Sequence, residues 1–471
     1  MKGIVFSCFF LLLGFTVEAQ KGYKIDCKIS NIGTKEIYMA YHLGSKQYLK
    51  DTAKLENGVF SFQGDEPLES GVYLIAIPPS NTYFEMLIDQ NNQFFQVETD
   101  SPDYNMNMKV MGSEDNRLFY EYIQYLGKMR MEAKRLSEKM QDEGTSEEEM
   151  LQAQEMLDAL NKQVTNYQSS ILEKPGNLFV SKLLKANQEI KVPEPPVNSD
   201  GSIDSTFRYR YYKAHYFDNL DLADDRLLRT PVLEQKVMTF IDKMVAPLPD
   251  SLIKEIDIIL ETAEKGEGEV FRFLLSTILN KYASSKIMGH DAVYVHLALK
   301  YYANKDRTSW VEEEQREKII DNAKKLDPLL IGKKAPNLEL TTLGGKATSL
   351  YNLKSKFVAV YFWDPDCGNC SKMSAKLVEV YKEFKSQGLE IFGICNKTYK
   401  EIAKCNEKEK EKQMDWINTA DPYGLGRAHT KYYIQANPTL YLLDENKVIR
   451  YKRIDADQLR DILNRELADK S

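Results

Sequence analysis

Strand-like apolar runs alternate with helix-like runs over residues 331–471, and this pattern constrains the fold more than any other feature of the chain. The runs "FVAVYFW", "LEIFGIC" and "TLYLLD" have the near-continuous apolar character of buried strands. Between them, "SKMSAKLVEVYKEFKSQ" and "KTYKEIAKCNEKEKEKQ" have helical spacing. Alternation of strands and helices predicts a partly parallel sheet with helices on its faces, so we expect an α/β domain here.

Residues 22–112 alternate polar and apolar positions as strands do. In "YKIDCKIS" every second side chain falls on one face, and this predicts that Cys27 is buried as a small apolar residue. Asn57-Gly58 separates two such runs and is a strong signal for a two-residue hairpin. We expect an antiparallel β-sandwich or half-barrel over this segment.

Residues 113–330 change to the helical period. Ser113 is placed to cap one long helix, and Ser146 with Glu149 forms a capping box for the next. The chain is therefore predicted to be multidomain, with a β domain, an α-helical domain and an α/β domain in that order. Neither of the first two domains contains a catalytic constellation, so no function is assigned to them.

Residues 1–19, "MKGIVFSCFFLLLGFTVEA", have the features of a secretory signal peptide. These features are a charged start, an apolar core, and small residues at Val17 and Ala19 before a cleavage site. The apolar core is too short to span a bilayer comfortably, so an uncleaved anchor is the weaker alternative, and membrane association is left open. We expect an exported protein in an oxidising compartment, where disulfides persist.

The chain has 6 cysteines, and removal of the signal peptide with Cys8 leaves an odd number. At least one thiol then has no partner within the chain. A chain of this size does not depend on disulfides for its fold, so we expect these cysteines to serve a special purpose. The net charge of −7 argues against nucleic acid as a partner, because nucleic acid needs a concentrated basic surface.

Two closely spaced cysteines, Cys367 and Cys370, join the predicted strand "FVAVYFW" to the helix that follows. The free N–H groups and the dipole at a helix start favour an anion, and they lower the pKa of a thiol placed there. A thiolate attacks a disulfide to form a mixed disulfide, which a second thiol can resolve. Because Cys367 precedes the helix and Cys370 lies in its first turn, we expect Cys367 to attack and Cys370 to resolve.

Other chemistry fits this pair less well. A zinc site needs two further ligands at clip spacing, and Cys395 and Cys405 are too far apart in the sequence for a clip. Attachment of a c-type haem needs a histidine after the second cysteine, where this chain has Ser371. A permanent structural disulfide remains an open alternative. We expect no metal and no bound cofactor besides the redox-active Cys367–Cys370 pair.

Several stretches of residues 331–471 resemble the TlpA/ResA-like thioredoxins, which are thiol–disulfide oxidoreductases of bacterial cell envelopes. "IGKKAPNLEL" resembles the I-G-x-x-A-P opening of the family, "VYFWDPDCGNC" its F-W-x-x-x-C-x-x-C stretch, and "QANPTLYLLDENKVI" its P-T segment. The resemblance implies a thioredoxin fold for this segment. With the β and helical domains before it, it implies a protein of the Gram-negative periplasm or cell envelope.

The resemblance also assigns roles to individual positions. Cys367 and Cys370 match the redox pair, and Trp363 matches the ring packed beside it. Pro438 matches a cis-proline that lies against the disulfide, and Asn437 before it would contact the incoming chain. The implied partners are client proteins with thiols or disulfides and an upstream redox protein that donates electrons.

Several positions depart from the family pattern. Tyr361 stands where many thioredoxins have a buried carboxylate, Met373 where some envelope members have a glutamate, and Ala375 where a proline kinks the helix. Asp364 and Asp366 are close to the cysteines, but we expect them to be solvated and to oppose thiolate formation. The usual proton-transfer carboxylate is therefore missing, so the sequence predicts neither the rate nor the redox potential.

A second pair of cysteines lies further along the same domain. Cys395 ends the strand "LEIFGIC", which should neighbour "FVAVYFW", and Cys405 lies in the next helical segment. A disulfide between Cys395 and Cys405 is geometrically possible if the helix folds back. A role as a second redox relay is the alternative.

The predicted function is the exchange of disulfides with envelope client proteins through Cys367 and Cys370, in the reductive direction by resemblance. The alternative is a binding protein, in which residues 22–330 hold a ligand or partner and the thioredoxin-like domain is a docking or structural module. A peroxidase ranks below both, because the P-x-x-x-T-x-x-C pattern of peroxidases is absent around Cys367.

Overall fold

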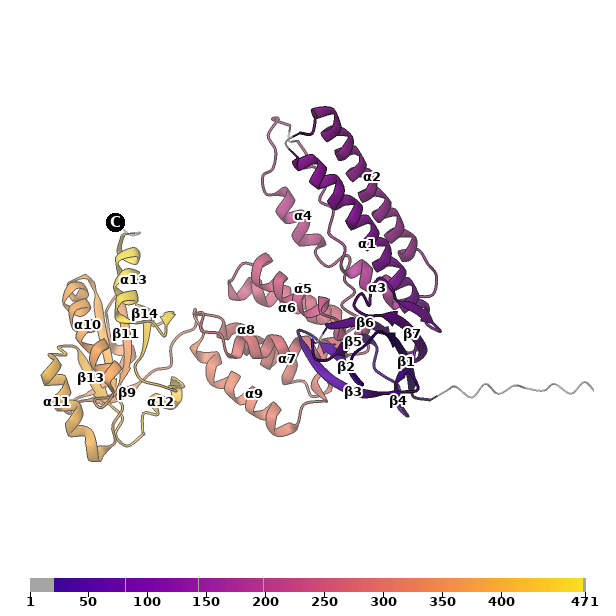
Figure 1. Ribbon diagram of the computed structural model, residues 1–471. Helices are drawn as coiled ribbons and strands as arrows, with labels where there is room; N and C mark the ends of the chain where they lie inside the picture. Colours follow the sequence, from indigo (N-terminus) through magenta and orange to yellow (C-terminus); the bar gives the residue numbers. More distant parts are fainter. Residues whose placement is uncertain (1–20, 81, 143, 198, 469–471) are drawn as a thin grey trace, which may run out of the picture. The chain divides into compact units, whose positions relative to one another are not determined.

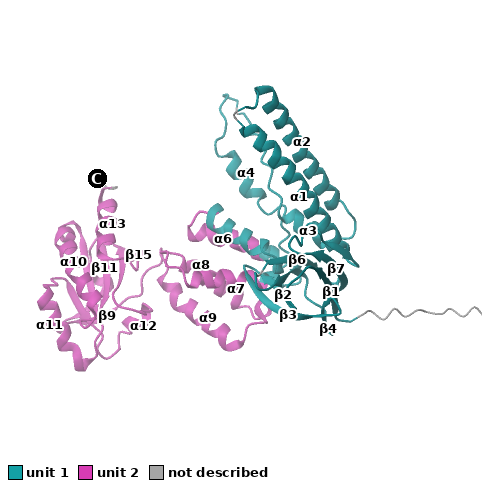
Figure 2. Cartoon of the chain, in the orientation of Figure 1, with its two compact units in different colours: residues 1–244, 261–271 teal, residues 245–260, 272–471 magenta. Residues whose placement is uncertain are grey.

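The computed structural model describes residues 21–80, 82–142, 144–197 and 199–468, and the predicted signal peptide at 1–19 lies outside them (Figure 1). The chain divides into two compact units, residues 1–244 with 261–271 and residues 245–260 with 272–471 (Figure 2). The helices of 113–330 are shared between these units, so the domain boundaries expected from the sequence stay predictions. Within the described ranges, no helix is both long and apolar enough to cross a membrane.

The first unit contains an 8-stranded curled sheet in the order β6-β5-β2-β3-β4-β1-β7-β8 (Figure 1). Its strands are β1 (Tyr23–Ser30), β2 (Glu36–Leu43), β3 (Lys46–Glu56), β4 (Val59–Gly64), β5 (Gly71–Ile77), β6 (Thr82–Ile88), β7 (Phe94–Asp100) and β8 (Lys109–Met111). The half-barrel prediction is confirmed, and Cys27 is fully buried as expected. Asn57 and Gly58, with φ of 50° and 85°, form the turn between β3 and β4.

One pairing in this sheet differs from the expected antiparallel arrangement. β1 pairs with β4 antiparallel on one side but with β7 in parallel on the other. The alternation of polar and apolar side chains sets which face of a strand is buried, but it does not choose the neighbouring strand. The parallel pairing of β1 with β7 therefore could not be predicted from the sequence pattern.

Helices follow the sheet in the first unit. They are α1 (Glu114–Gln141), α2 (Glu147–Leu172), α3 (Phe179–Ala186), α4 (Phe207–His215) and α5 (Val232–Thr239). Ser113 accepts a hydrogen bond from the backbone N–H of Asn116 and caps α1, and Ser146 with Glu149 forms the predicted capping box of α2. The long helices α1 and α2 pack against each other.

Helical segments also precede the C-terminal sheet. They are α6 (Pro249–Ala263), α7 (Glu269–Ala283), α8 (Asp291–Leu297) and α9 (Glu313–Leu326). Within the second unit, the Lys452 ammonium group pairs with the carboxylate of Asp291 at the start of α8. The Tyr433 hydroxyl donates a hydrogen bond to the side chain of Asn322 in α9 at 2.8 Å. These polar contacts join α8 and α9 to the α/β part of the same unit.

The C-terminal domain is a 7-stranded sheet in the order β10-β9-β13-β12-β11-β14-β15. Its strands are β9 (Glu339–Thr342), β10 (Ala347–Ser349), β11 (Phe357–Trp363), β12 (Leu389–Cys395), β13 (Ile417–Ala420), β14 (Thr439–Asp444) and β15 (Ile449–Lys452). Its helices are α10 (Gly368–Phe384), α11 (Ile402–Lys412), α12 (Ala428–Lys431) and α13 (Ala456–Ala468). The predicted thioredoxin-like α/β fold is confirmed.

The centre of this sheet positions the candidate site. β11, β12 and β13 run parallel, so their carboxyl ends meet at one edge. Every residue of β11 is buried, because its side chains alternate between two apolar cores on opposite faces of the sheet. One cysteine pair follows the carboxyl end of β11, and the other begins at Cys395, the last residue of β12, so both lie at the edge where functional groups collect in open α/β sheets.

Candidate active site

Cys367 occupies the N-cap position of α10. Its backbone is extended, with φ of −91° and ψ of 115°, and its Sγ accepts the backbone N–H of Cys370 at 3.1 Å. This geometry offers the sulfur a free amide of the first turn together with the positive end of the helix dipole. Both groups stabilise a thiolate. Cys367 and Cys370 are free thiols here.

The two thiols differ in exposure. Cys367 is partly exposed, whereas Cys370 is fully buried behind it in the first turn of α10. Burial raises the pKa of the Cys370 thiol well above its ordinary value, and the neighbouring Cys367 sulfur adds to the shift. An incoming disulfide can therefore reach Cys367 first, and Cys370 must lose its proton when it attacks.

The loop before β14 lies against Cys367. The Asn437–Pro438 peptide bond is cis, and the Asn437 carbonyl oxygen lies 3.7 Å from the Cys367 Sγ, where it accepts the thiol hydrogen. The side-chain Oδ1 of Asn437 is buried and has no hydrogen-bond partner among the residues that the structure describes. The structure thus brings together Cys367, Cys370 and the Asn437–Pro438 loop.

Trp363 ends β11 and is almost fully buried. Its ring belongs to the apolar core that also contains Cys370, Cys395 and Cys405, and Cys367 packs against this core. The indole N–H has no hydrogen-bond acceptor within the described part of the chain. A ring in this position can pack against the redox pair from the core, but it offers little exposed surface to a client.

The hydroxyl of Tyr361 takes the place where many thioredoxins have a carboxylate. It donates to the Cys370 carbonyl oxygen at 3.2 Å and shares a hydrogen bond with the Ser374 hydroxyl at 3.0 Å. Burial raises the pKa of Tyr361, so this side chain is neutral and is not a base near neutral pH. The sequence reasoning missed Ser374, although its position one helical turn after Cys370 was a usable signal.

Lysine side chains neutralise the two carboxylates beside Cys367. Lys397 Nζ lies 2.9 Å from carboxylate oxygens of both Asp364 and Asp366, and Lys404 Nζ lies 2.9 Å from Asp366. The lysine hydrogen bonds, with that of Lys404 the strongest, lower the pKa of Asp366 to about 2. The expectation of solvation is wrong for Asp364, whose side chain is only 18% exposed. Asp366 is 53% exposed, as expected, but it is also paired with both lysines.

Lys397 and Lys404 were absent from the candidate residues because they are remote in sequence from Cys367. Lys397 follows the carboxyl end of β12, and only the pairing of β12 with β11 shows that it faces Asp364. Lys404 belongs to α11, whose direction the sequence did not settle. The usable signal was a pair of basic residues expected at the same sheet edge as two aspartates.

Cys395 and Cys405 are joined by a disulfide, with Cα atoms 6.3 Å apart. Cys395 lies opposite Trp363 in the β11–β12 pairing, and Cys405 reaches the sheet from α11. Both residues are almost fully buried, so a dissolved thiol has no direct access to their sulfurs. This burial favours a structural tie over a second redox relay.

Three family models match separate parts of the chain. Residues 23–119 match DUF4369 and residues 139–327 match DUF5106, both described as domains of unknown function. Residues 331–452 match the AhpC/TSA family. The model match over 331–452 agrees with the observed thioredoxin-like domain, and the first two matches bring no activity.

Curated relatives align with the C-terminal domain. The chain is 38% identical over 68 residues to the thiol-disulfide oxidoreductase ResA of Bacillus thuringiensis, which is 14% of this chain and 39% of that protein. It is 29% identical over 132 residues to peroxiredoxin Q of Oryza sativa subsp. japonica, which is 26% of this chain and 57% of that protein. The chain thus spans less than two thirds of the length of either relative.

Two solved structures show similarity to parts of the chain. One is a domain of a possible thiol-disulfide isomerase from Cytophaga hutchinsonii, with 33% identity, a TM-score of 0.28, and coverage of 30% of this chain and 96% of that one. Another is a thioredoxin-like protein from Bacteroides caccae, with 21% identity, a TM-score of 0.44, and coverage of 58% and 98%.

Proposed function

We propose that this chain exchanges disulfides with thiol-containing client proteins, since its C-terminal domain has the thioredoxin fold of the AhpC/TSA family and resembles ResA-type thiol–disulfide oxidoreductases. The observation that carries the proposal is the position of Cys367 as the N-cap of α10, with the Cys370 N–H 3.1 Å from its sulfur. The exposed sulfur is the nucleophile, and the buried Cys370 resolves the intermediate.

The proposed reductive cycle has two steps. The Cys367 thiolate attacks one sulfur of a client disulfide and forms a mixed disulfide, and the other client sulfur leaves as a thiolate that takes up a proton. Cys370 then gives up its proton and attacks the Cys367 sulfur, which releases the second client thiol. The client has gained two electrons, and the domain is left with a Cys367–Cys370 disulfide that an upstream dithiol protein reduces.

Several finer points belong to the same proposal. The cycle uses the cysteine pair alone and needs no bound cofactor. Export to the periplasm or cell envelope is supported by the signal-peptide pattern of residues 1–19. The reductive direction is supported by the resemblance to the TlpA/ResA-like thioredoxins. The roles of Asn437 and Pro438 in receiving the client are supported by the contact of their loop with Cys367.

Thiol trapping tests the proposal directly. The Cys370→Ser variant cannot resolve the mixed disulfide, so it should accumulate covalent adducts with several envelope proteins, and dithiothreitol should release them. The matched control is Cys367→Ser with Cys370→Ser, which should form none. If Cys370→Ser folds but traps no client, the exchange function is contradicted, and the binding-protein alternative for residues 22–330 takes its place.

A peroxidase is the second candidate, because of the similarity to peroxiredoxin Q. In the peroxidase pattern a proline and a threonine precede the reactive cysteine, and this chain has Val360 and Asp364 at those positions. We therefore expect hydrogen peroxide to oxidise Cys367 no faster than an ordinary thiolate. Rapid peroxide consumption in a coupled assay would favour the peroxidase.

A further inference from the structure

We propose that Lys397 and Lys404 are positioning residues for the Cys367 nucleophile. They neutralise the two carboxylates that lead into it, and the Cys395–Cys405 disulfide holds both lysines in place. The inference rests on the proposed function, because it concerns the reactivity of the proposed attacking thiol.

The carboxylates are built into the turn that delivers Cys367 to the helix. The Cys367 N–H donates to the Asp364 carbonyl oxygen at 3.2 Å, and the Asp366 N–H donates to the Asp364 carboxylate at 2.8 Å. The turn therefore links both acidic residues to the backbone of the reactive cysteine. Uncompensated negative charge near a thiol disfavours its thiolate.

The lysines supply the compensation from two other segments. Lys397 bridges both carboxylates at 2.9 Å. Its pair with Asp364 has side chains only 11% and 18% exposed, so solvent and salt screen that pair less than a surface pair. Lys404 contacts Asp366 at 2.9 Å and also pairs with Glu401 at 3.0 Å. The cluster thus balances most of its own charge beside Cys367.

The His429 side chain also interacts with this cluster. Burial lowers the pKa of His429, and the carboxylates of Asp421 and Asp364 oppose that shift. His429 is therefore mainly neutral at neutral pH and does not replace the lysines. Among the residues that the structure describes, Lys397 and Lys404 are the cations that pair with the two aspartates.

The Cys395–Cys405 disulfide holds the segment that carries both lysines. Lys397 closely follows Cys395, and Lys404 directly precedes Cys405. The bond ties α11 to the carboxyl end of β12, and the Asn396 N–H donates to the Trp363 carbonyl oxygen at 2.8 Å, which holds the loop against β11. Without the bond, only the backbone on either side of α11 and non-covalent contacts would hold α11 at this edge.

The rate of alkylation of Cys367 by iodoacetamide measures this effect without any client. In a Cys370→Ser background Cys367 cannot form its disulfide with position 370, so no reductant has to be added. The Cys395–Cys405 bond therefore stays intact during the assay. Iodoacetamide is uncharged, so removal of a lysine does not change its attraction to the protein. At low ionic strength and neutral pH, Lys397→Met and Lys404→Met should each slow alkylation by about two- to fivefold.

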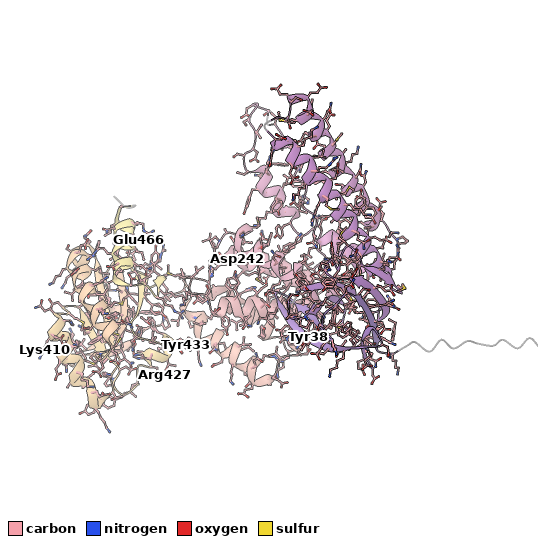
Figure 3. The ribbon with its side chains drawn as sticks, in the orientation of Figure 1. Tyr38, Asp242, Lys410, Arg427, Tyr433 and Glu466 are labelled. Atoms are coloured by element: carbon pink, nitrogen blue, oxygen red, sulfur yellow. A yellow bond between two sulfur atoms is a disulfide. The ribbon has the colours of Figure 1, made fainter. Side chains whose placement is uncertain are left out.

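Control and rescue variants separate electrostatics from damage to the fold. Lys410→Met changes another lysine of α11, which lies at the outer edge of the unit in Figure 3, and should leave the rate unchanged. Lys404→Arg should retain the rate, and Asp366→Asn should restore it in the Lys404→Met variant. Added salt should shrink the differences.

The disulfide is tested in the same assay. Cys395→Ser with Cys405→Ser should slow alkylation by a similar factor and add little to Lys404→Met. Normal rates in both lysine variants, or a slow rate that Asp366→Asn fails to restore, would overturn the inference. If the paired serine variant does not fold, the lysine variants still decide. If these alkylation rates respond as expected but Cys370→Ser traps no client, the proposed function is contradicted and the inference about the lysines stands.

Discussion

The segments after β11 and after β12 each carry a cysteine to the same edge of the C-terminal sheet, where Trp363 and Cys395 lie opposite each other. After β11, Cys367 occupies the cap of α10 and accepts an amide hydrogen bond. At β12, Cys395 is the last residue of the strand, and Cys405 lies inside α11 and folds back to bond it in the core. The position of each cysteine relative to the strand end and the helix start therefore decides whether its sulfur meets free amides or buried apolar side chains.

The largest contrast between the two pairs is in activity. Cys367→Ser should lower the rate of disulfide reduction in a model peptide by at least about 1,000-fold, because it removes the nucleophile. Cys395→Ser with Cys405→Ser should keep the rate within about tenfold of the parent, because that pair acts only through the placement of charges. Stopped-flow assays with dithiothreitol as the electron donor measure both. Equal losses of reduction rate in the two variants would contradict the expected difference between the two cysteine pairs.

Stability should show the opposite contrast. The Cys395–Cys405 bond closes a short loop with a sequence separation of 10. Its removal should lower the free energy of unfolding by about 2.7 kcal/mol on the chain-entropy estimate. Cys367→Ser with Cys370→Ser should change it by less than about 1 kcal/mol, because no bond is lost from the reduced protein. Urea denaturation followed by tryptophan fluorescence, without reductant, compares the two. A larger loss from the second variant would contradict this assignment.

The pH dependence of the resolving step sharpens the difference between the two thiols of the active pair. Burial raises the pKa of the Cys370 thiol, so only a small fraction is thiolate near neutral pH. That fraction rises about tenfold for each pH unit below the pKa, and the release of a peptide from its mixed disulfide with Cys367 should rise equally from pH 6 to pH 8. A rate that levels off below pH 8 would show that Cys370 is already ionised.

The smallest expected effect concerns Tyr361. Tyr361→Phe removes the hydrogen bonds to Ser374 and to the Cys370 carbonyl oxygen. We expect a loss of about 1 kcal/mol in the free energy of unfolding, and less than about a twofold change in the exchange rate. Urea denaturation and the peptide assay measure these changes. A loss of activity above tenfold would instead show that the hydroxyl takes part in proton transfer, as the missing carboxylate would.

Features fixed by neighbours in sequence could be predicted from the sequence. The caps Ser113 and Ser146 act within one helical turn, and the buried strand β11 is visible from its continuous apolar run. The order of strand, Cys367, Cys370 and helix could be placed for the same reason. Local backbone geometry and burial determine these features, and both can be recognised from the order of residues.

Features that depend on the choice of a distant partner could not be predicted. The parallel pairing of β1 with β7 and the Lys397 contacts with Asp364 both require knowing which segments become neighbours. The Cys395–Cys405 bond could be stated only as one alternative, because the direction of α11 decides whether the two sulfurs meet. Charge, alternation and spacing describe a segment and do not choose the segment against which it packs.

A redox titration of the full chain, with mass-spectrometric labelling of each cysteine, tests the contrast between the two pairs most directly. We expect Cys367 and Cys370 to become available to the label together, at a potential where Cys395 and Cys405 remain bonded. Buried structural disulfides typically need potentials below about −300 mV for reduction. Reduction of both pairs at one potential, or a Cys367–Cys370 bond that persists after Cys395–Cys405 has opened, would contradict the account.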